Sequence, residues 1–419
     1  MASHGNPAWP RGLPCVLALW QVAACLLVSG TLTRGARQPH VVFIVADDLG
    51  WNDVPWHNAG LFSPNLARLA SEGVILEQYY AQPVCTPWHL GYCNWSYTPT
   101  ARGFDSFSGF YLGSQDHYTH TAWVNTHAEG FDYRANSTPD WDARNRYSSK
   151  LLADDVVEVL DHHAGQNRPL FLYVAFQAVH APLQVPPKYE VPCTNYQNTN
   201  RRLLCAFSSD NGGQILHGGN NWPLRGNKGT LWEGGTRVPA FVAGPVLKKA
   251  GYTNSKVVHA VDWFPTLLSL AGLKGAPDGI DGLNQWEVLS EDAAQVRHEF
   301  VYNIRKRHHL EGAIRNGDYK FILGDGGHPN GWYPEPDFDE HIEKEDSGNI
   351  SRALFNVRSD PEEKHDLSSS QPELVVLLEK RLRRLARSLV PEDDPGDDPS
   401  GDPRRWGGLY TPGWCTPRR

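Results

Sequence analysis

Several kinds of residue are scarce in this chain of 419 residues, and each scarcity excludes a class of protein. Lys and Arg number 39 against 47 Asp and Glu, so the net charge is −8 and the basic excess of a nucleic-acid binder is missing. Seven cysteines are too few for a disulfide scaffold and too scattered for a zinc site. Hydrophobic residues make up 40 % and charged residues 21 %, which is the composition of an ordinary globular protein. The length corresponds to about two to three domains.

Long apolar runs are also missing, except at the amino terminus. Residues 1–35 contain Arg11, then a largely apolar run from Leu13 to Val28, then small residues. This order predicts a secretory signal peptide, with a signal anchor as the alternative. The run is too short and interrupted to favour a membrane span. We therefore expect a protein of the secretory pathway, lysosomal or secreted, with no membrane span in its mature form. Asn-x-Ser/Thr sequons, which favour a glycoprotein, occur at Asn94, Asn136 and Asn349.

Three apolar segments predict strands buried on both faces of a sheet. They are His40–Ala46, Pro169–Phe176 and Leu203–Phe207, and Val238–Ala243 is expected to form a fourth strand. A helix is predicted to begin at Ser63-Pro64 and to end at Gly73. Strands that alternate with helices predict an α/β fold, with a mixed, mostly parallel sheet sandwiched by helices.

The composition changes near residue 300. We expect a catalytic domain over residues 37–300, a smaller α+β domain over residues 301–390 and a loose tail over residues 391–419. The tail is predicted from its Pro, Asp and Gly content. Within the smaller domain, Gly312–Leu323 predicts a hairpin around an Asn-Gly turn. A surface helix with basic residues on its outer face is predicted over Pro372–Leu389.

Acidic and amide side chains directly follow two of the predicted strands. Asp47 and Asp48 come after the first, and Asp210 and Asn211 come after the third. Ligands of open α/β sheets bind at the carboxyl ends of the strands. If these strands are neighbours, three carboxylates and one amide form an oxygen cage suited to Ca²⁺ or Mg²⁺. The alternative is ordinary turn chemistry, in which both motifs only shape loops.

Two cationic side chains could contact an anionic substrate. His180 follows the second predicted strand, and Lys228 lies in a Gly-containing loop. Taken alone, such a histidine is more often structural and such a lysine more often solvated.

Several longer segments, which span most of residues 38 to 370, match a known family: PHVVFIVADDLGWNDV, QPVCTP, RGFDSFSGFYLGSQDHY, PLFLYVAFQAVHAPLQVP, FSSDNGGQ, GGNNWPLRGNKGTLWEGGTR and DWFPTLLSLAG, followed by the weaker GAIRNGDYKFILGDGG and LFNVRSDPEEKHDL. Through these segments the chain resembles the type I sulfatases, and most closely the arylsulfatase B group (N-acetylgalactosamine-4-sulfatases). The resemblance implies an alkaline-phosphatase-like fold. It also implies hydrolysis of sulfate esters, either of small aryl substrates or of glycosaminoglycans that carry N-acetylgalactosamine 4-sulfate.

The resemblance also implies roles for individual residues. Asp47, Asp48, Asp210 and Asn211 correspond to the ligands of one Ca²⁺ ion, and His180 and Lys228 correspond to sulfate-binding groups. Cys85 corresponds to the cysteine that a formylglycine-generating enzyme oxidises in the endoplasmic reticulum, and His89 to a histidine that hydrogen-bonds the modified residue. The hydrated aldehyde supplies one hydroxyl to attack sulfur and a second hydroxyl to expel the sulfate.

The chain departs from the family pattern at the catalytic motif. The family motif is Cys-x-Pro-x-Arg, and here His89 replaces the arginine after Cys85 and Pro87. Trp88–Gly91 matches the end of a later family motif, Gly-Lys-Trp-His-Leu-Gly, so two motifs are fused. We expect internal truncations near residues 87/88 and 190–203. The loss of packed helices would uncover the sheet and leave a chain that is poorly stable and inactive even if folded.

Three functions remain open from the sequence. The first is a sulfatase. The second is a catalytically silent relative that keeps the Ca²⁺ site and binds sulfated glycans. The third is a phosphoesterase or phosphonate hydrolase that uses Thr86 as its nucleophile, which the sulfatase-like NNWPLRGNKGTLWEGG segment disfavours.

Overall fold

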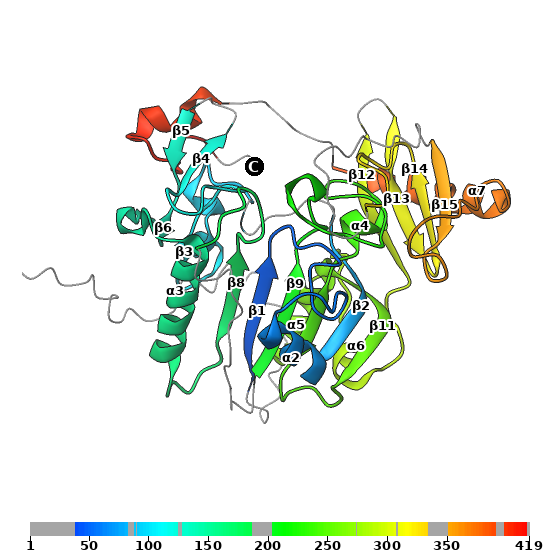
Figure 1. Cartoon of the computed structure of the whole chain (residues 1–419), viewed down its shortest axis with the longest axis horizontal. Coiled ribbons are helices and arrows are strands. Elements are labelled where there is room, and N and C mark those ends of the chain that lie inside the picture. Colours follow the sequence, from blue (N-terminus) through cyan, green and yellow to red (C-terminus); the bar gives the residue numbers. More distant parts are fainter. Residues whose placement is uncertain are drawn as a thin grey trace, which may run out of the picture.

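A six-stranded mixed sheet forms the centre of the computed structural model, which describes residues 38–82, 88, 90–124, 128–186, 203–273, 275–306, 309–333, 351–390 and 398–416. The strand order is β11-β2-β10-β9-β1-β8 (Figure 1). The strands are β1 (His40–Ala46), β2 (Val74–Tyr80), β8 (Phe171–Phe176), β9 (Leu203–Ser209), β10 (Ala240–Ala243) and β11 (Tyr252–His259). Strand β1 is parallel to β8 and β9, β11 is parallel to β2, and β10 is antiparallel to both of its neighbours. The expected mixed, mostly parallel sheet is therefore confirmed.

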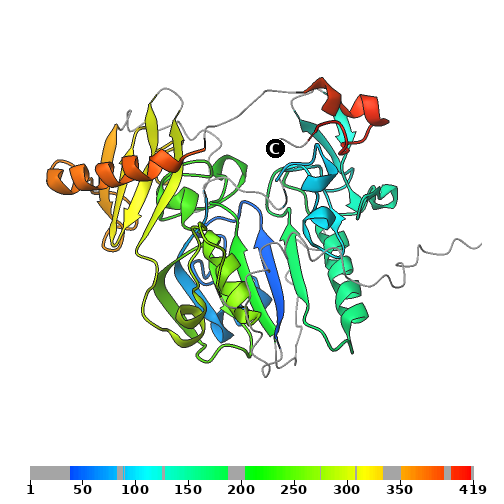
Figure 2. The same cartoon turned by 180° about the vertical axis from the view of Figure 1, so that it is seen from behind.

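Helices cover both faces of this sheet. On one face α2 (Pro64–Glu72) places Ala70 in a cluster with Phe207 and Phe241, and it begins and ends at the predicted residues. The other face is covered by α5 (Trp263–Leu270) and α6 (Trp286–Glu291), which come to the front in Figure 2, where the molecule is seen from behind. The Trp263 ring meets the Phe43 ring edge-on, with 4.9 Å between the ring centroids.

Strand β8 differs from the sequence expectation. We predicted a strand buried on both faces, but Phe171 is 49 % exposed and Tyr173 is 39 % exposed. The physical reason is position: β8 is the edge strand, and the core cluster beneath α5 and α6 includes no residue of β8. Leu203–Phe207, by contrast, lies inside β9, which is buried along almost its whole length.

Smaller elements stand beside the β8 edge. They are α3 (Ser148–His163), the two-stranded ribbon β4 (Thr121–Val124) and β5 (Ala128–Phe131), and the small sheet β3 (Ser108–Gly109), β6 (Arg134–Ala135) and β7 (Thr138–Pro139). The short helix α4 (Glu233–Thr236) follows the Lys228 loop.

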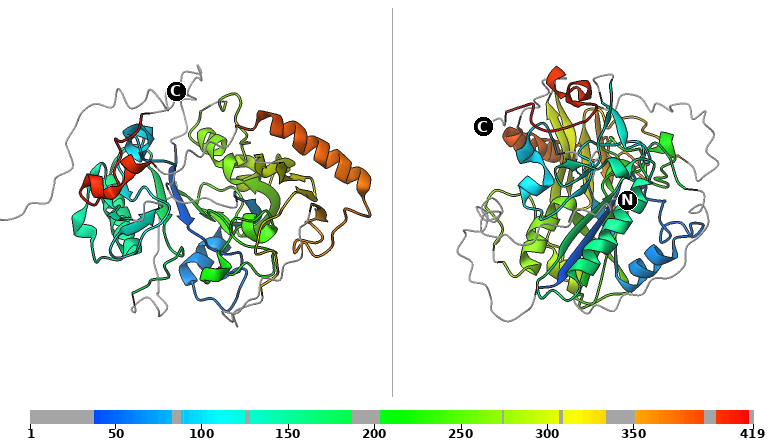
Figure 3. Two further views of the ribbon diagram at one scale, coloured as in Figure 1. Left: turned by 90° about the horizontal axis from the view of Figure 1, so that it is seen from above. Right: turned by 90° about the vertical axis from the view of Figure 1, so that its left-hand side faces the viewer.

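The second sheet is antiparallel and has the order β12-β13-β14-β15. Its strands are β12 (Glu299–Lys306), β13 (Leu310–Asn316), β14 (Tyr319–Leu323) and β15 (Arg352–Asn356), and α7 (Pro372–Leu385) packs on it (Figure 3, left). The hairpin predicted around Asn316-Gly317 is confirmed, because β13 and β14 pair across that turn. Helix α7 buries Val375, Leu378 and Leu382, so the predicted surface helix is also confirmed.

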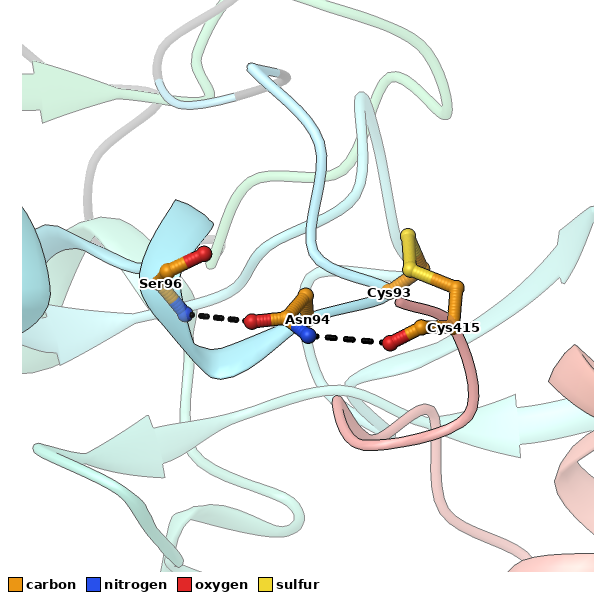
Figure 4. The surroundings of a disulfide bond; sticks show 4 residues. All are labelled: Cys93, Asn94, Ser96 and Cys415. Atoms are coloured by element: carbon orange, nitrogen blue, oxygen red, sulfur yellow. Dashed lines mark hydrogen bonds between the residues drawn. A yellow bond between two sulfur atoms is a disulfide. The ribbon is translucent and has the colours of Figure 1, made fainter. Parts of the chain in front are cut away.

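The end of the described chain is packed, which corrects the expectation of a loose tail for residues 398–416. This segment returns to the β4–β5 ribbon, at the opposite end of the molecule from α7 (Figure 1). Leu409 forms a bridge with Phe131, and Tyr410 is only 1 % exposed. A disulfide joins Cys93 to Cys415 (Figure 4), a pairing that the sequence did not reveal.

Several sequence predictions concern residues outside the described part. These are the signal peptide, Cys85, Thr86, Pro87, His89, the 190–203 truncation up to residue 202, and the sequon at Asn349. The expected domain boundaries stay a prediction. Within the described ranges, none of the helices combines the length and the apolar character that crossing a membrane requires.

Candidate metal and anion site

The polar residues predicted as a site come together because their strands are neighbours. In the parallel register Ala46 of β1 lies opposite Ser209 of β9 and Phe176 of β8. Asp47 and Asp48 therefore leave the sheet beside Asp210 and Asn211. Ser209 ties the two loops together, since its hydroxyl accepts a hydrogen bond from the Leu49 amide and donates one to the Asn211 carbonyl.

Asp48 stands at the centre of the cluster. Its Oδ1 accepts hydrogen bonds from Asn211 Nδ2 at 2.7 Å and Lys228 Nζ at 2.6 Å. Its Oδ2 lies 3.7 Å from His180 Nε2, and its backbone amide donates to Asp210 Oδ1 at 3.1 Å. The backbone of Asp48 has φ 60°, a left-handed conformation that costs energy for a residue other than glycine. Such strain is typical of positions held in place by a functional site.

The cluster concentrates negative charge away from water. Asp47 is 0 % exposed and Asp48 is 3 % exposed. Burial, followed by the nearby Asp210 and Asp48 carboxylates, raises the pKa of Asp47 well above its ordinary value. Burial likewise raises the pKa of Asp210 to about 7, with the Asp48 charge acting in the same direction. Lys228 offsets only part of this repulsion, so the three carboxylates favour a further positive charge among them.

Unpaired oxygens show where a cation fits. Both carboxylate oxygens of Asp47, Oδ2 of Asp48 and Oδ2 of Asp210 are buried without a hydrogen-bond partner. Buried carboxylate oxygens are costly unless they are paired or coordinate a metal. Potential ligand atoms of Asp47, Asp48 and His180 all lie within 4.8 Å of one another. These two carboxylates and one imidazole can hold a metal ion, whereas the sequence analysis predicted a cage of oxygen ligands without His180. The identity of the ion stays a prediction.

Asn211 lies at the cluster but presents its amide nitrogen to Asp48, and the same nitrogen donates to the Gly212 carbonyl. The role of metal ligand requires the amide to present its oxygen instead.

His180 is held by a network that the sequence analysis missed. Its Nδ1 lies 2.6 Å from the Ala181 carbonyl, which leaves Nε2 facing Asp48. The buried side chain of His117 supports the loop, with Nε2 at 3.4 Å from the His180 carbonyl and Nδ1 at 2.9 Å from Ser148 Oγ. His117 lies within a segment that resembles the family, GSQDHY, and that resemblance was the only signal for it.

Lys228 reaches the cluster from a tight loop between two glycines. Gly226 and Gly229 have φ 87° and 83°, which favour glycine. A Cβ on Gly226 would come within 2.6 Å of the Trp232 Cβ, so the close packing of the loop also requires glycine there. The Lys228 amide donates to the Gly213 carbonyl at 3.2 Å, which anchors the loop beside Asn211. The lysine side chain is 14 % exposed, so its ammonium group lies at the edge of the cluster, where an anion can approach.

The structure thus brings together six of the eight predicted site residues. The other two, Cys85 and His89, lie outside the described residues, so the expected nucleophile is not placed.

Comparison with known proteins identifies the class. A family model described as Sulfatase matches residues 84–203 and 196–273. The chain is 35 % identical over 486 residues to arylsulfatase J of Mus musculus, which covers 91 % of this chain and 81 % of that protein. It is 24 % identical over 413 residues to N-acetylgalactosamine-6-sulfatase of Mus musculus, which covers 73 % of this chain and 76 % of that one.

Among solved structures, the chain is similar to Ps i-CgsB in complex with k-i-k-neocarrahexaose. The TM-score is 0.66 and the identity 22 %, and the match covers 84 % of this chain and 93 % of that one. This similarity shows the fold, the alkaline-phosphatase-like α/β architecture. The match to arylsulfatase J shows that the chain belongs to the sulfatase family, a class of sulfuric ester hydrolases. The finer resemblance to the arylsulfatase B group stays a prediction.

Proposed function

We propose that this chain is a Ca²⁺-dependent sulfatase of the secretory pathway, lysosomal or secreted, and that its substrates are glycosaminoglycans carrying N-acetylgalactosamine 4-sulfate. One observation carries the metal and anion part of the proposal. Four buried carboxylate oxygens without hydrogen-bond partners lie beside a lysine that is open to an approaching anion. The named relatives support a sulfated sugar as substrate, since one of them is an N-acetylgalactosamine-6-sulfatase. The 4-sulfate preference comes from the resemblance to the arylsulfatase B group.

Each residue has a role in this proposal. Asp47, Asp48 and Asp210 hold the cation through their free oxygens, and Asn211 joins them if its amide turns. A bound divalent cation would neutralise the sulfate and polarise its oxygens. Lys228 donates to a sulfate oxygen as a compact cation, and it can keep its contact with Asp48 because its ammonium group has three protons.

His180 hydrogen-bonds the ester oxygen through Nε2 as the bond to sulfur breaks, while its Nδ1 stays on the Ala181 carbonyl. Cys85 is the proposed site of formylglycine, made by the formylglycine-generating enzyme, and His89 is its proposed hydrogen-bond partner.

A second candidate function has its own observation. The motif after Cys85 has His89 in place of arginine, which favours a chain that binds cations and sulfated glycans without turnover. The alignment to arylsulfatase J supports an internal loss. It spans 486 positions, whereas 91 % of 419 residues is about 381, so the relative is longer by about 105 positions across the match.

Turnover separates the candidate functions. The protein is produced in cells that contain the formylglycine-generating enzyme and is tested with 4-nitrocatechol sulfate and, in parallel, 4-nitrophenyl phosphate. Sulfate release supports the sulfatase, phosphate release supports the phosphoesterase, and neither supports the silent relative. Mass spectrometry of the peptide that contains Cys85 shows independently whether the aldehyde forms.

Calcium binding tests the metal site whether or not the chain turns over. We expect Ca²⁺ to raise the melting temperature of the wild type, because a ligand that binds only the folded state stabilises it. The Asp47→Asn variant should lose this shift, and Asp105→Asn, a change at an exposed aspartate, should keep it. An equal Ca²⁺ shift in wild type and Asp47→Asn would contradict the proposed site.

A further inference from the structure

A basic groove lies on the outer side of α7, away from the metal and anion site. The groove has a volume of about 430 Å³. Five of its lining residues are cations and one is acidic: Arg352, Lys380, Arg383, Arg384, Arg387 and Glu379. This surplus of positive charge stands out on a chain whose net charge is −8. The local charge of the groove is therefore opposite in sign to the net charge of the protein.

Glu379 neutralises only part of the groove. Its Oε2 pairs with Arg352 at 2.9 Å, and its Oε1 pairs with Arg383 at 2.7 Å. For Lys380, Arg384 and Arg387, no carboxylate partner is found within the described ranges of the chain. Among the described residues these three cations therefore have no counter-charge, and the trio of Arg352, Arg383 and Glu379 adds one more positive charge.

The three unpaired cations form a row, which we call the basic stripe (Lys380, Arg384 and Arg387). Lys380 and Arg384 are four residues apart on α7, and Arg387 follows three residues later in the 3-10 turn Ala386–Ser388 that continues the helix, so the three lie along one side. With a rise of about 1.5 Å per residue, the row is about 10 Å long. All three side chains are exposed. Like charges at this spacing destabilise a helix slightly, so the stripe reduces the stability of α7 unless an anion binds it.

The helix dipole does not account for the stripe. It corresponds to about half a negative charge at the carboxyl end of a helix, and it acts only over the last turn. Arg383 and Arg384 already lie in the last turn of α7, whereas Lys380 lies one turn earlier. The stripe therefore provides more positive charge than the end of the helix needs.

A second groove extends the first. It has a volume of about 590 Å³ and shares Arg352 and Arg383 with the groove on α7. It continues past His309 and the β13–β14 pair, where the acidic Glu311 and Asp325 also line it. The two grooves are adjacent at Arg352 and Arg383, so an extended chain bound along α7 can reach the second groove, whereas the positive charge is concentrated in the first.

We propose that the basic stripe and its groove bind a sulfated polysaccharide chain at a place separate from the hydrolytic site. The polysaccharide class rests on the proposed function, since a sulfatase of glycosaminoglycans meets polymers with repeated sulfate groups. Regularly spaced anions match a row of regularly spaced cations, and the release of counter-ions makes such binding strongly dependent on salt. The exosite would hold the polymer while single sulfate esters reach Asp48 and Lys228.

The test compares two triple variants of the full chain that change the net charge equally. Lys380→Gln/Arg384→Gln/Arg387→Gln removes the basic stripe. The control, Arg68→Gln/Lys150→Gln/Lys248→Gln, removes three exposed cations that pair with single carboxylates elsewhere. Binding to chondroitin 4-sulfate and heparin is measured by NaCl elution and by titration at several salt concentrations, with a double-stranded DNA fragment of matched charge beside them.

We expect the stripe variant to lose about 10- to 100-fold in affinity for the sulfated polymers at 0.1 M salt and to show a shallower salt dependence. The control should stay within about twofold of the wild type, because solvated, paired surface charges contribute little. Equal retention of both variants would overturn the proposal, as would equal binding of DNA and polysaccharide by the wild type. The proposal would also be overturned if the wild type did not bind the sulfated polymers. That result is expected if the chain's own carboxylates neutralise the stripe.

Failure of the exosite can be told apart from failure of the proposed function. Binding is read without turnover, so a chain without sulfatase activity still tests the stripe. If the enzyme is active, the stripe variant should keep wild-type turnover of 4-nitrocatechol sulfate and show a raised KM only on polymeric substrate. Normal turnover with unchanged polymer binding would leave the proposed function standing and reject the exosite alone.

Discussion

The buried ammonium group of Lys320 offers the sharpest test of how the two sheets are joined. Lys320 lies in β14, is 0 % exposed, and sits 3.0 Å from Glu233 Oε1 and 2.9 Å from Glu363 Oε1. Glu233 begins α4, so the lysine links the second sheet to the helix that follows the Lys228 loop. The perturbation is Lys320→Met, which keeps the unbranched chain and removes the charge.

The two carboxylates share the lysine unequally. Burial opposes the ionisation of Glu233, but Lys320, Arg237 and Arg315 outweigh it and lower its pKa. Burial raises the pKa of Glu363 to about 7, and Lys320 offsets only part of that rise. Glu233 is therefore the ionised partner, and Glu363 is protonated below neutral pH.

These directions fix the sign of the pH dependence. A carboxyl whose pKa is raised on folding contributes stability below its unfolded pKa, about 4.5, and loses it as the pH rises through its folded value, about 7. The loss is about 1.4 kcal/mol per pH unit, and in the wild type it ends near pH 7. Without Lys320 the pKa of Glu363 rises further, so the variant should keep losing stability up to pH 8. We expect Lys320→Met to cost about 3 kcal/mol at pH 6, and about 1.4 kcal/mol more at pH 8.

Urea unfolding at pH 6, 7 and 8 measures both numbers, provided the slope of the free energy against urea is the same for the two proteins. The matched control is Lys364→Met, because Lys364 pairs with Glu362 on the surface. It should cost less than about 0.5 kcal/mol and follow the wild-type pH curve. The reasoning is refuted if Lys320→Met costs less than about 1 kcal/mol, or if its loss is the same at pH 6 and pH 8.

Three further changes test other parts of the structure. Burial lowers the pKa of His259 to about 4, so the stability that the neutral imidazole contributes is present above pH 6.5 and is lost as the pH falls. In urea unfolding, the wild type should lose stability between pH 7 and pH 5, and His259→Asn should remove about 2 kcal/mol of that loss. An unchanged difference between the two pH values would contradict this. Cys415→Ser should lower the free energy of unfolding by about 2–5 kcal/mol, to the level of the reduced wild type, and a variant as stable as the oxidised protein would argue against the Cys93–Cys415 bond. Asn136→Gln should reduce the mobility shift on glycosidase treatment by one glycan, whereas Asn94→Gln should leave the shift unchanged. The Asn94 amide nitrogen donates to the Cys415 carbonyl beside the disulfide, whereas Asn136 uses only its oxygen, and the opposite pattern would reject this assignment.

The site could be predicted where local sequence pattern and sheet topology agree. Apolar runs that end in Asp47-Asp48 and Asp210-Asn211 predicted two parallel strands with polar ends, and the register of β1 and β9 brings those ends together. The pattern also predicted α2 and the β13–β14 hairpin, since a proline in the first turn of a helix, a glycine after its last residue and an Asn-Gly turn are encoded by adjacent residues.

Features that depend on distant contacts could not be predicted in this way. Cys93 and Cys415 are 322 residues apart, and nothing near either of them signals the other. The tail is polar and rich in proline, which indicated a loose segment, yet Tyr410 is buried against the β4–β5 ribbon. Local composition indicates whether a segment can form a hydrophobic core by itself. It does not indicate whether the segment packs into a core formed by distant parts of the chain.

In β8 the local sequence predicted the strand correctly, but the burial of the strand depends on distant contacts and was not predicted. Its sequence, FLYVAF, is apolar enough for a strand covered on both sides, and such runs are typical of parallel sheets. Phe171 is nevertheless 49 % exposed and Tyr173 39 % exposed, while the equally apolar β9 is buried. As the edge strand, β8 therefore presents an apolar face on which a further element could pack. The exposed face agrees with the internal loss that we infer from the fused motif at Cys85. We predict that a longer form of this chain, with a helix restored over β8, buries Phe171 and is more stable than the present chain.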